Sequence, residues 1–151
     1  MRIFVFDLDF TIWDAGGTWC DATSPPYKWE NGKLLDQKGG WIRLYEEVVE
    51  ILDVLKSQNK FIVAASRTYR PIWAQELLQL LDIDKYFDLK EIYPSSKIHH
   101  FNQIENHFKM LFSEMVFFDD EYRNVREVSA LGVNSVLVSK GITLSMVKEY
   151  L

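Results

Sequence analysis

The chain has 151 residues, of which 48% are hydrophobic and 26% charged, a composition typical of one globular domain rather than a disordered segment. Its formal net charge of −5 argues against a nucleic-acid binder, which usually carries a basic face. Cys20 is the only cysteine, so no intrachain disulfide can form, and no apolar run approaches the ~20 residues that cross a bilayer. We expect a soluble, cytoplasmic protein without a membrane or nucleic-acid partner.

Runs of β-branched and aromatic residues alternate along the chain with segments of helical spacing. In chain order, the sequence predicts a strand at 3–6, a helix at 44–55, a strand at 61–65, a helix at 72–81, a short extended piece at 89–93, a helix at 101–111, a strand at 115–118, a helix at 125–131 and a strand at 133–138. This order predicts an α/β fold with a doubly wound, mostly parallel, Rossmann-like sheet covered by helices on both faces.

The stretch from about residue 10 to 42 is much longer than a usual connection between a strand and a helix. It holds four of the five tryptophans, which argues against a disordered linker. Asn31-Gly32 is suited to a two-residue hairpin turn between residues 27–30 and 33–36. We therefore interpret residues 10–42 as an ordered flap with a hairpin, inside a single domain that spans residues 1–151. Most of its tryptophans are expected to pack together, and one could line an entrance to a site.

Polar clusters at the carboxyl ends of three predicted strands are the main functional signal. They are Asp7 and Asp9 after the first strand, Ser66-Arg67-Thr68 after the second, and Asp119-Asp120 after a later one. Ligands of open α/β sheets bind outside these strand ends. Asp7 and Asp9 would point to the same side of an extended chain, roughly 6.6 Å apart, so one could attack a reacting centre while the other delivers a proton.

Converging carboxylates repel one another, and we therefore expect a bound cation. All the nearby ligands are hard oxygens, which favours Mg²⁺ over zinc. Each cluster alone could be a solvated turn or a helix cap. The coincidence of three clusters at the ends of buried runs favours a functional site.

The segments that carry these clusters resemble the small eukaryotic magnesium-dependent phosphatase family of the haloacid dehalogenase superfamily. The similarity rests on four segments in the family's order and approximate spacing: FDLDFTIW at 6–13, AASRT at 64–68, EIYP at 91–94 with Ser96-Lys97 and His100-Phe101, and MVFFDDE at 115–121 with Arg123-Asn124. Tyr122 and Asp14 depart from the family's usual pattern. The resemblance implies a haloacid dehalogenase-type fold without a full cap domain.

The resemblance also implies a role for particular residues. Asp7 would attack phosphorus and form an aspartyl-phosphate, and Asp9 would act as general acid and then as general base. Lys97 would offset negative charge on the nucleophile and bind the phosphoryl group. Ser66 would also bind phosphoryl oxygens, and Arg67 would contact the substrate rather than be a mere surface charge. The implied ligands of Mg²⁺ are Asp7, Asp9 through its backbone carbonyl, and Asp119, with Asp120 either a further ligand or a hydrogen-bonding partner of the ligands.

The short segment between Ser66 and Lys97 leaves no room for a cap, so the site should be open. By resemblance, the substrate would be a small-molecule phosphate ester or a phosphorylated or glycated protein: a sugar phosphate, a glycated-amine phosphate or a phosphotyrosine-like ester. If the substrate were a phosphotyrosine-like ester, this chain would have protein tyrosine phosphatase activity. His99, His100 and His107 are predicted to have surface or capping roles, and Cys20 lacks the signs of a nucleophile.

Two other classes of function remain open from the sequence. A phospho-acceptor signalling domain also gathers acidic residues around an aspartate, although Asp9 favours turnover. A catalytically silent interaction module could keep the fold, although no catalytic position is missing. A nucleic-acid end phosphatase is an alternative at the level of the substrate, and the acidic balance argues against it.

Overall fold

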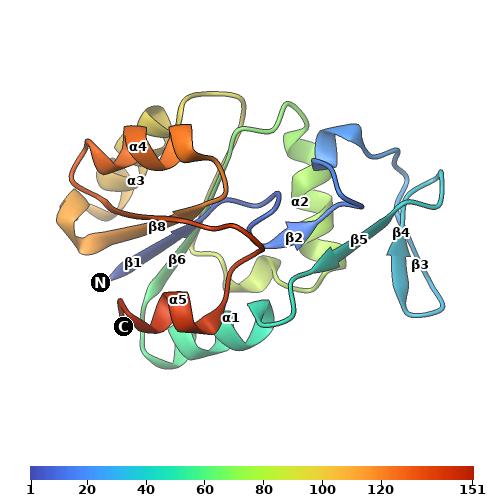
Figure 1. Ribbon diagram of the computed structural model, residues 1–151, viewed down its shortest axis with the longest axis horizontal. Helices are drawn as coiled ribbons and strands as arrows, with labels where there is room; N and C mark the ends of the chain where they lie inside the picture. The colour runs from blue at the N-terminus through green and yellow to red at the C-terminus, as the bar shows by residue number, and fades with distance from the viewer.

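A five-stranded parallel sheet forms the centre of the computed structural model, which describes all 151 residues (Figure 1). The strand order is β7-β6-β1-β8-β9, and all four neighbouring pairs are parallel. The bounds are Ile3–Phe6 for β1, Phe61–Ser66 for β6, Leu89–Ile92 for β7, Met115–Asp119 for β8 and Asn134–Leu137 for β9. The predicted doubly wound α/β fold is confirmed.

Alternate residues of the central strands enter two separate cores, because successive side chains of a strand point to opposite faces. Phe4 and Phe6 pack on the face covered by α1 (Val48–Ser57), α2 (Pro71–Leu80) and α5 (Leu144–Lys148). Ile3 and Val5 pack on the opposite face, under α3 (Lys97–Phe108) and α4 (Tyr122–Ser129). With both faces buried, β1 has no exposed residue, which explains its continuous apolar run.

The flap is an ordered antiparallel sheet that extends from one end of the molecule (Figure 1). Its strand order is β2-β5-β4-β3, with bounds Trp13–Asp14 for β2, Lys28–Glu30 for β3, Lys33–Leu35 for β4 and Trp41–Leu44 for β5. The predicted hairpin turn is present, with φ of +52° at Asn31 and +77° at Gly32. A short 3₁₀ helix, η1 (Cys20–Ala22), lies between β2 and β3. The other short 3₁₀ helices are η2 (Asp84–Tyr86) and η3 (Phe112–Glu114).

The structure departs from the predicted elements at four points. Leu44 belongs to β5, so its helical spacing to Val48 is a coincidence across the junction of a strand and a helix. Leu111 lies beyond the end of α3 and is exposed, as is Ile72 in α2. The short helix α5 was not predicted, because five residues are too few to show a periodic pattern.

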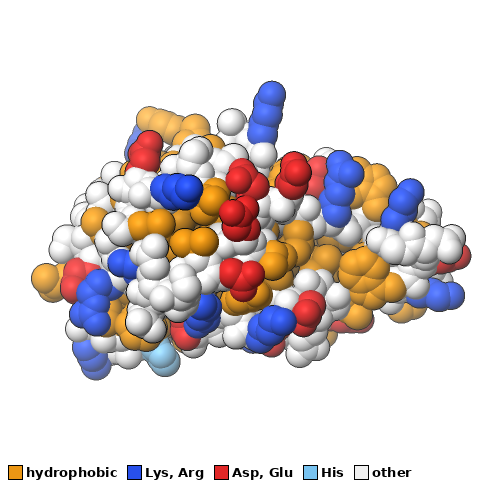
Figure 2. Space-filling model, turned by 90° about the horizontal axis from the view of Figure 1, so that it is seen from below, with side chains coloured by type: hydrophobic (Ala, Val, Ile, Leu, Met, Phe, Trp, Pro, Cys, Tyr) orange, Lys and Arg blue, Asp and Glu red, His pale blue; other side chains and the backbone are white.

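The surface mixes charges of both signs. On the face in Figure 2, acidic side chains gather near the middle, basic side chains are scattered, and hydrophobic side chains are exposed toward the flap end. Trp19, Trp29 and Trp41 are among the exposed hydrophobic residues, whereas Trp13 is fully buried. None of the helices combines the length and apolar character that a bilayer crossing requires.

Gly141 provides a test of the packing between the C-terminal segment and the residues before α1. Its φ is +77°, and an added Cβ would fall 2.2–2.6 Å from three ring atoms of Tyr45. We expect Gly141→Ala to lower the free energy of unfolding by about 3 kcal/mol, because backbone strain and overlap add. Gly17→Ala is the control, since φ is +83° there but no atom lies within 4 Å; about 1 kcal/mol is expected. Urea unfolding measures both, and equal losses would contradict this account of the packing.

Candidate active site

The candidate site lies at the point where the strand order of the sheet reverses. From β1 the chain builds β6 and β7 on one side and then returns to place β8 on the other side. Asp7 follows β1 directly, and Asp119 is the last residue of β8. One carboxylate oxygen from each of Asp7, Asp119 and Asp120 lies within 4.8 Å of the others. The crevice at such a switch point is where open α/β sheets bind ligands.

Lys97 joins the strand ends from the first turn of α3. Its side chain is buried, and Nζ lies 3.0 Å from Asp7 Oδ1 and 3.1 Å from Asp119 Oδ2. The same amino group donates a hydrogen bond to the carbonyl oxygen of Ala65 in β6. The helix begins here because Ser96 is its N-cap and accepts a hydrogen bond from the amide of His99. Lys97 therefore has an acceptor for each of its three N–H groups.

The electrostatics of the cluster favour a further cation. Burial raises the pKa of Asp7 well above its usual range, and the neighbouring Asp119 adds to this effect, while Lys97 opposes it. Burial also raises the pKa of Asp120 to about 6. Burial disfavours the charge of Lys97, but Asp7 and Asp119 outweigh burial and raise its pKa. One ammonium group among three carboxylates leaves net negative charge, and the donors are all hard oxygens, so the set fits a divalent cation such as Mg²⁺.

Asn124 is a site residue to which the sequence analysis assigned no role. It is buried in the first turn of α4, where Nδ2 donates to Asp119 Oδ2 (3.2 Å) and Oδ1 accepts from Arg67 Nη1 (3.0 Å). The backbone amide of Glu121 donates to the other oxygen of Asp119. Asn124 therefore connects Arg67 to the carboxylate cluster. Its place in a short helix directly after the Asp119-Asp120 pair was the signal that could have identified it.

A cleft of about 500 Å³ opens above these residues. It is lined by six of the predicted site residues: Asp7, Asp9, Ser66, Arg67, Lys97 and Asp120. Asp119 lies beneath the cleft, fully buried. The structure thus brings every predicted site residue to one place. Trp19, Tyr69 and Arg123 also line the cleft, so one flap tryptophan borders the entrance while Trp13 is part of the core.

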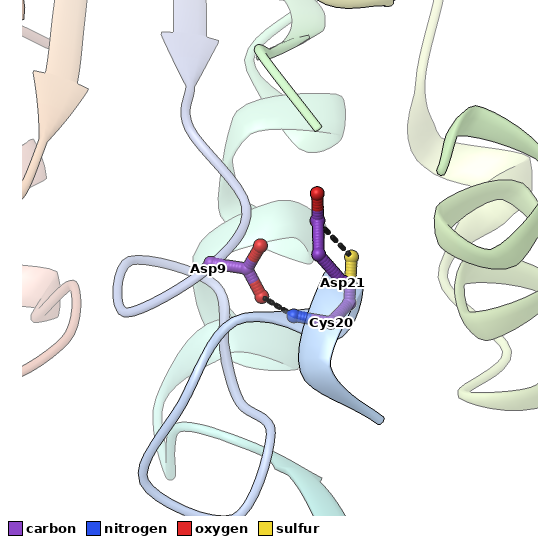
Figure 3. A group of neighbouring side chains, drawn as sticks. All are labelled: Asp9, Cys20 and Asp21. Atoms are coloured by element: carbon purple, nitrogen blue, oxygen red, sulfur yellow. Dashed lines mark hydrogen bonds between the residues drawn. The ribbon is translucent and has the colours of Figure 1, made fainter. Parts of the chain in front are cut away.

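The flap reaches the site through Asp9, Cys20 and Asp21, which Figure 3 shows. Asp9 Oδ1 accepts hydrogen bonds from Trp13 Nε1 at 2.7 Å and from the amide of Cys20 at 2.8 Å. Burial raises the pKa of Asp9 to about 6, which these two hydrogen bonds oppose.

Asp21 fastens the flap to the loop after β6. Its Oδ1 accepts a hydrogen bond from Thr68 Oγ1, and its Oδ2 accepts one from the amide of Tyr69. The amide of Thr68 donates in turn to Ser66 Oγ at 3.3 Å. The sequence analysis gave Asp21 no role, and no motif signalled it.

The remaining candidates do not enter the site. Burial raises the pKa of the Cys20 thiol, which is the opposite of what a nucleophile needs. His99 and His107 are exposed, as predicted. His100 was predicted on the surface or as a cap and is instead fully buried, with Nε2 3.1 Å from the carbonyl oxygen of Tyr93. Burial lowers the pKa of His100 to about 4.

Comparison with known proteins also indicates a phosphatase. The family model described as acid phosphatase matches residues 1–151. The human protein magnesium-dependent phosphatase 1 is 41% identical over 150 residues, covering 98% of this chain and 84% of the human one. A putative phosphatase from Clostridium difficile has a similar fold, with a TM-score of 0.72 and 18% identity over 99% of this chain and 90% of its own. The N-terminal part of a Bacteroides fragilis protein, described as containing a phosphatase domain complexed with Mg, gives a TM-score of 0.63 and 16% identity over 91% of this chain and 35% of its own.

A doubly wound sheet with acidic, hydroxyl and lysine side chains at its strand ends is consistent with the phosphatases of the haloacid dehalogenase superfamily, as the sequence resemblance implied. The HAD-like hydrolase superfamily protein P8B7.31 of Schizosaccharomyces pombe is 39% identical over 145 residues, covering 87% of this chain and 82% of its own. Within that superfamily, the chain belongs to the acid phosphatase family, whose model matches it over its full length. The predicted resemblance and the predicted class of enzyme, a phosphatase, are confirmed.

Lys97 allows a test of the electrostatic centre. Lys97→Met should lower the free energy of unfolding by about 3 kcal/mol or more, because it leaves the fully buried carboxylate of Asp119 and the largely buried one of Asp7 without their counter-charge. Lys56→Met is the matched control, since it also breaks a 3.0 Å ion pair, with Asp88, but both side chains there are about one-third exposed. A loss below about 1 kcal/mol is expected for the control. Urea unfolding in EDTA compares the two, and similar losses would mean that Lys97 does not hold the strand ends together.

Proposed function

We propose that this protein is a magnesium-dependent phosphomonoester hydrolase that works through an aspartyl-phosphate on Asp7. The observation that carries the proposal is the position of the Asp7 carboxylate. It lines the cleft, its Oδ1 is held 3.0 Å from Lys97 Nζ, and carboxylates of Asp119 and Asp120 are beside it. A nucleophilic carboxylate with a fixed cation on one oxygen is suited to in-line attack on phosphorus.

Asp7, Asp119, Asp120 and the backbone carbonyl of Asp9 would hold Mg²⁺. When bound, the ion would neutralise carboxylate and phosphoryl charge and help orient the ester. The name of the human relative, magnesium-dependent phosphatase 1, supports this choice of metal. The net negative charge among the three carboxylates supports it independently.

In the first step, a carboxylate oxygen of Asp7 forms a bond to phosphorus while the bond from phosphorus to the leaving oxygen breaks. Asp9, protonated at the start, gives its proton to that oxygen, so that an alcohol departs. Lys97 offsets charge beside the nucleophile. Ser66 and Arg67, which line the cleft, would donate hydrogen bonds to phosphoryl oxygens.

In the second step, water attacks phosphorus and the bond from phosphorus to Asp7 breaks. Asp9, now ionised, accepts a proton from the water, and inorganic phosphate is released. Both active carboxylates return to their starting states. The same residue serves as acid and then as base, so both steps depend on Asp9.

For the substrate, we propose a small phosphate ester or an exposed phosphate on a protein, since no cap closes the cleft. Trp19 and Tyr69 at its border suit a sugar or aryl group, in keeping with a sugar phosphate, a glycated-amine phosphate or a phosphotyrosine-like ester. The net charge of −5 makes nucleic-acid ends a poor substrate. We propose action in the cytoplasm.

The first test of the proposal is phosphate release from p-nitrophenyl phosphate. Turnover is expected with Mg²⁺, and it should be abolished by EDTA and reduced by at least about 1,000-fold by Asp7→Asn, since the nucleophile is lost. His107→Ala is the control, because the His107 side chain is exposed on α3, and this variant should retain full activity. Absence of turnover in folded protein would favour the catalytically silent module. A stable phosphoenzyme without turnover would favour the signalling domain.

A second test concerns Asp9. Asp9→Asn should slow both steps by roughly 100-fold or more, because an amide can neither give up a proton to the leaving oxygen nor take one from water. Rapid quench with ³²P-labelled substrate measures the rates at which phosphoenzyme forms and decays. Wild-type rates in both phases would remove Asp9 from the chemistry.

A further inference from the structure

The Asp9 carboxylate is held entirely by the flap. Both N–H groups that donate to it end on Oδ1, one from the indole of Trp13 and one from the backbone amide of Cys20. In Figure 3 the other oxygen, Oδ2, points away from the amide nitrogen of Cys20. Asp9 also lines the cleft, although only 8% of its surface is exposed. The two oxygens of this carboxylate therefore have different surroundings.

The two hydrogen bonds limit where a proton can lie. A carboxylate oxygen has about two lone-pair sites, and on Oδ1 both are occupied by N–H donors. A proton on Oδ1 would displace one of these donors and leave a buried N–H group without a partner, which is costly. A proton on Asp9 is therefore directed to Oδ2.

Trp13 is well suited to hold this arrangement rigidly. Its ring is fully buried, and its backbone is paired with Leu44 of β5. Its carbonyl oxygen also accepts a hydrogen bond from the amide of Phe10, and its amide donates to Leu8, so the loop that carries Asp9 is closed at Trp13. A packed aromatic residue thus fixes both the backbone and the side chain of Asp9.

We propose that Trp13 and the Cys20 amide are positioning groups that present Asp9 Oδ2 to the leaving oxygen of the substrate. The flap is then part of the proton-transfer machinery rather than only a wall of the cleft. In the first step the proton moves from Oδ2 to the leaving oxygen as the phosphorus–oxygen bond breaks, while Oδ1 keeps both N–H donors. This inference rests on the proposed function, namely on Asp9 as the general acid.

The test compares two esters that differ in their need for a proton. The leaving group of glycerol 2-phosphate requires protonation, whereas that of 2,4-dinitrophenyl phosphate does not. The measured quantity is kcat/KM, which reports the steps up to formation of the phosphoenzyme. Trp13→Phe removes the N–H group and keeps an aromatic ring. It should lower kcat/KM for glycerol 2-phosphate by about tenfold or more, part of the full contribution of a general acid, and change that for the dinitrophenyl ester by less than about threefold.

Cys20→Pro tests the second donor without altering the Trp13 ring. The backbone accepts proline here, because Cys20 is the first residue of η1 and Trp19 before it is extended, with φ −81° and ψ 155°. The proline ring takes the place of the amide hydrogen that is directed at Asp9 Oδ1, so this variant removes the donor and also displaces Oδ1 from its present position. The effect of losing the thiol is measured separately with Cys20→Ala, which keeps the amide. The expected result is a loss selective for glycerol 2-phosphate in Cys20→Pro relative to Cys20→Ala. This pair decides the question if Trp13→Phe does not fold.

Trp73→Phe is the control for the loss of an indole, because Trp73 is half-buried on α2 and lies outside the cleft. This variant should show no loss that is selective for glycerol 2-phosphate.

Asp9→Asn distinguishes a failure of the proposed function from a failure of the positioning role. If Asp9→Asn shows no selectivity between the esters, the general-acid role in the proposed function fails, and this inference fails with it. If Asp9→Asn is selective but the Trp13 and Cys20→Pro variants lose activity equally on both esters, or lose none, only the positioning role is overturned.

Discussion

The ammonium group of Lys97 lies among two carboxylates and a carbonyl oxygen with almost no contact with water, and the centre of the molecule is arranged around it. Removing such charges from water costs several kcal/mol for each ion, so the cluster is tolerable only with close and complete pairing. Three strands and one helix provide that pairing: Asp7 follows β1, Asp119 ends β8, Ala65 is in β6 and Lys97 begins α3. The contacts of Lys97 that join β1, β6, β8 and α3 are therefore also the contacts that form the candidate site.

This arrangement also bears on the proposed reaction of the carboxylates. Three clustered acids without a counter-charge would bind protons, and a protonated Asp7 is a poor nucleophile. Lys97 supplies one fixed positive charge, and the cluster needs more, so the proposed metal would have an electrostatic as well as a catalytic function. Asn124 extends the network to Arg67, so the group proposed to bind substrate is oriented by the same carboxylate that is proposed to bind metal.

The flap contributes the other half of the site. Its residues hold Asp9 on one oxygen, and Asp21 ties η1 to the loop that carries Ser66 and Arg67. The flap is much smaller than a cap domain, and it leaves the cleft open. Because its anchors are hydrogen bonds to groups in the site, the order of the flap and the position of the proposed proton donor are physically coupled.

The sequence by itself determined the central sheet and the residues that meet at its edge. Buried strands such as Ile3–Phe6 are continuous apolar runs, and polar residues at their carboxyl ends must converge when the strands are parallel. Asp7, Asp9, Ser66 and Asp119 could therefore be predicted together, and Lys97, which begins a helix, was added by the family resemblance. The Asn31-Gly32 turn was also predictable, because its requirement for positive φ is local.

Only the tertiary structure decided the contacts between residues that no periodic pattern connects. The pairing of Asp9 with Trp13 and Cys20, the bond from Asp21 to Thr68 and the bridge through Asn124 depend on how the flap and α4 pack, which is set by the whole core. The strand identity of Leu44 and the burial of His100 have the same origin, since their local spacing fits more than one structure. Spacing along a chain specifies which face a residue occupies within its element, but the partner on that face is chosen by packing against distant segments.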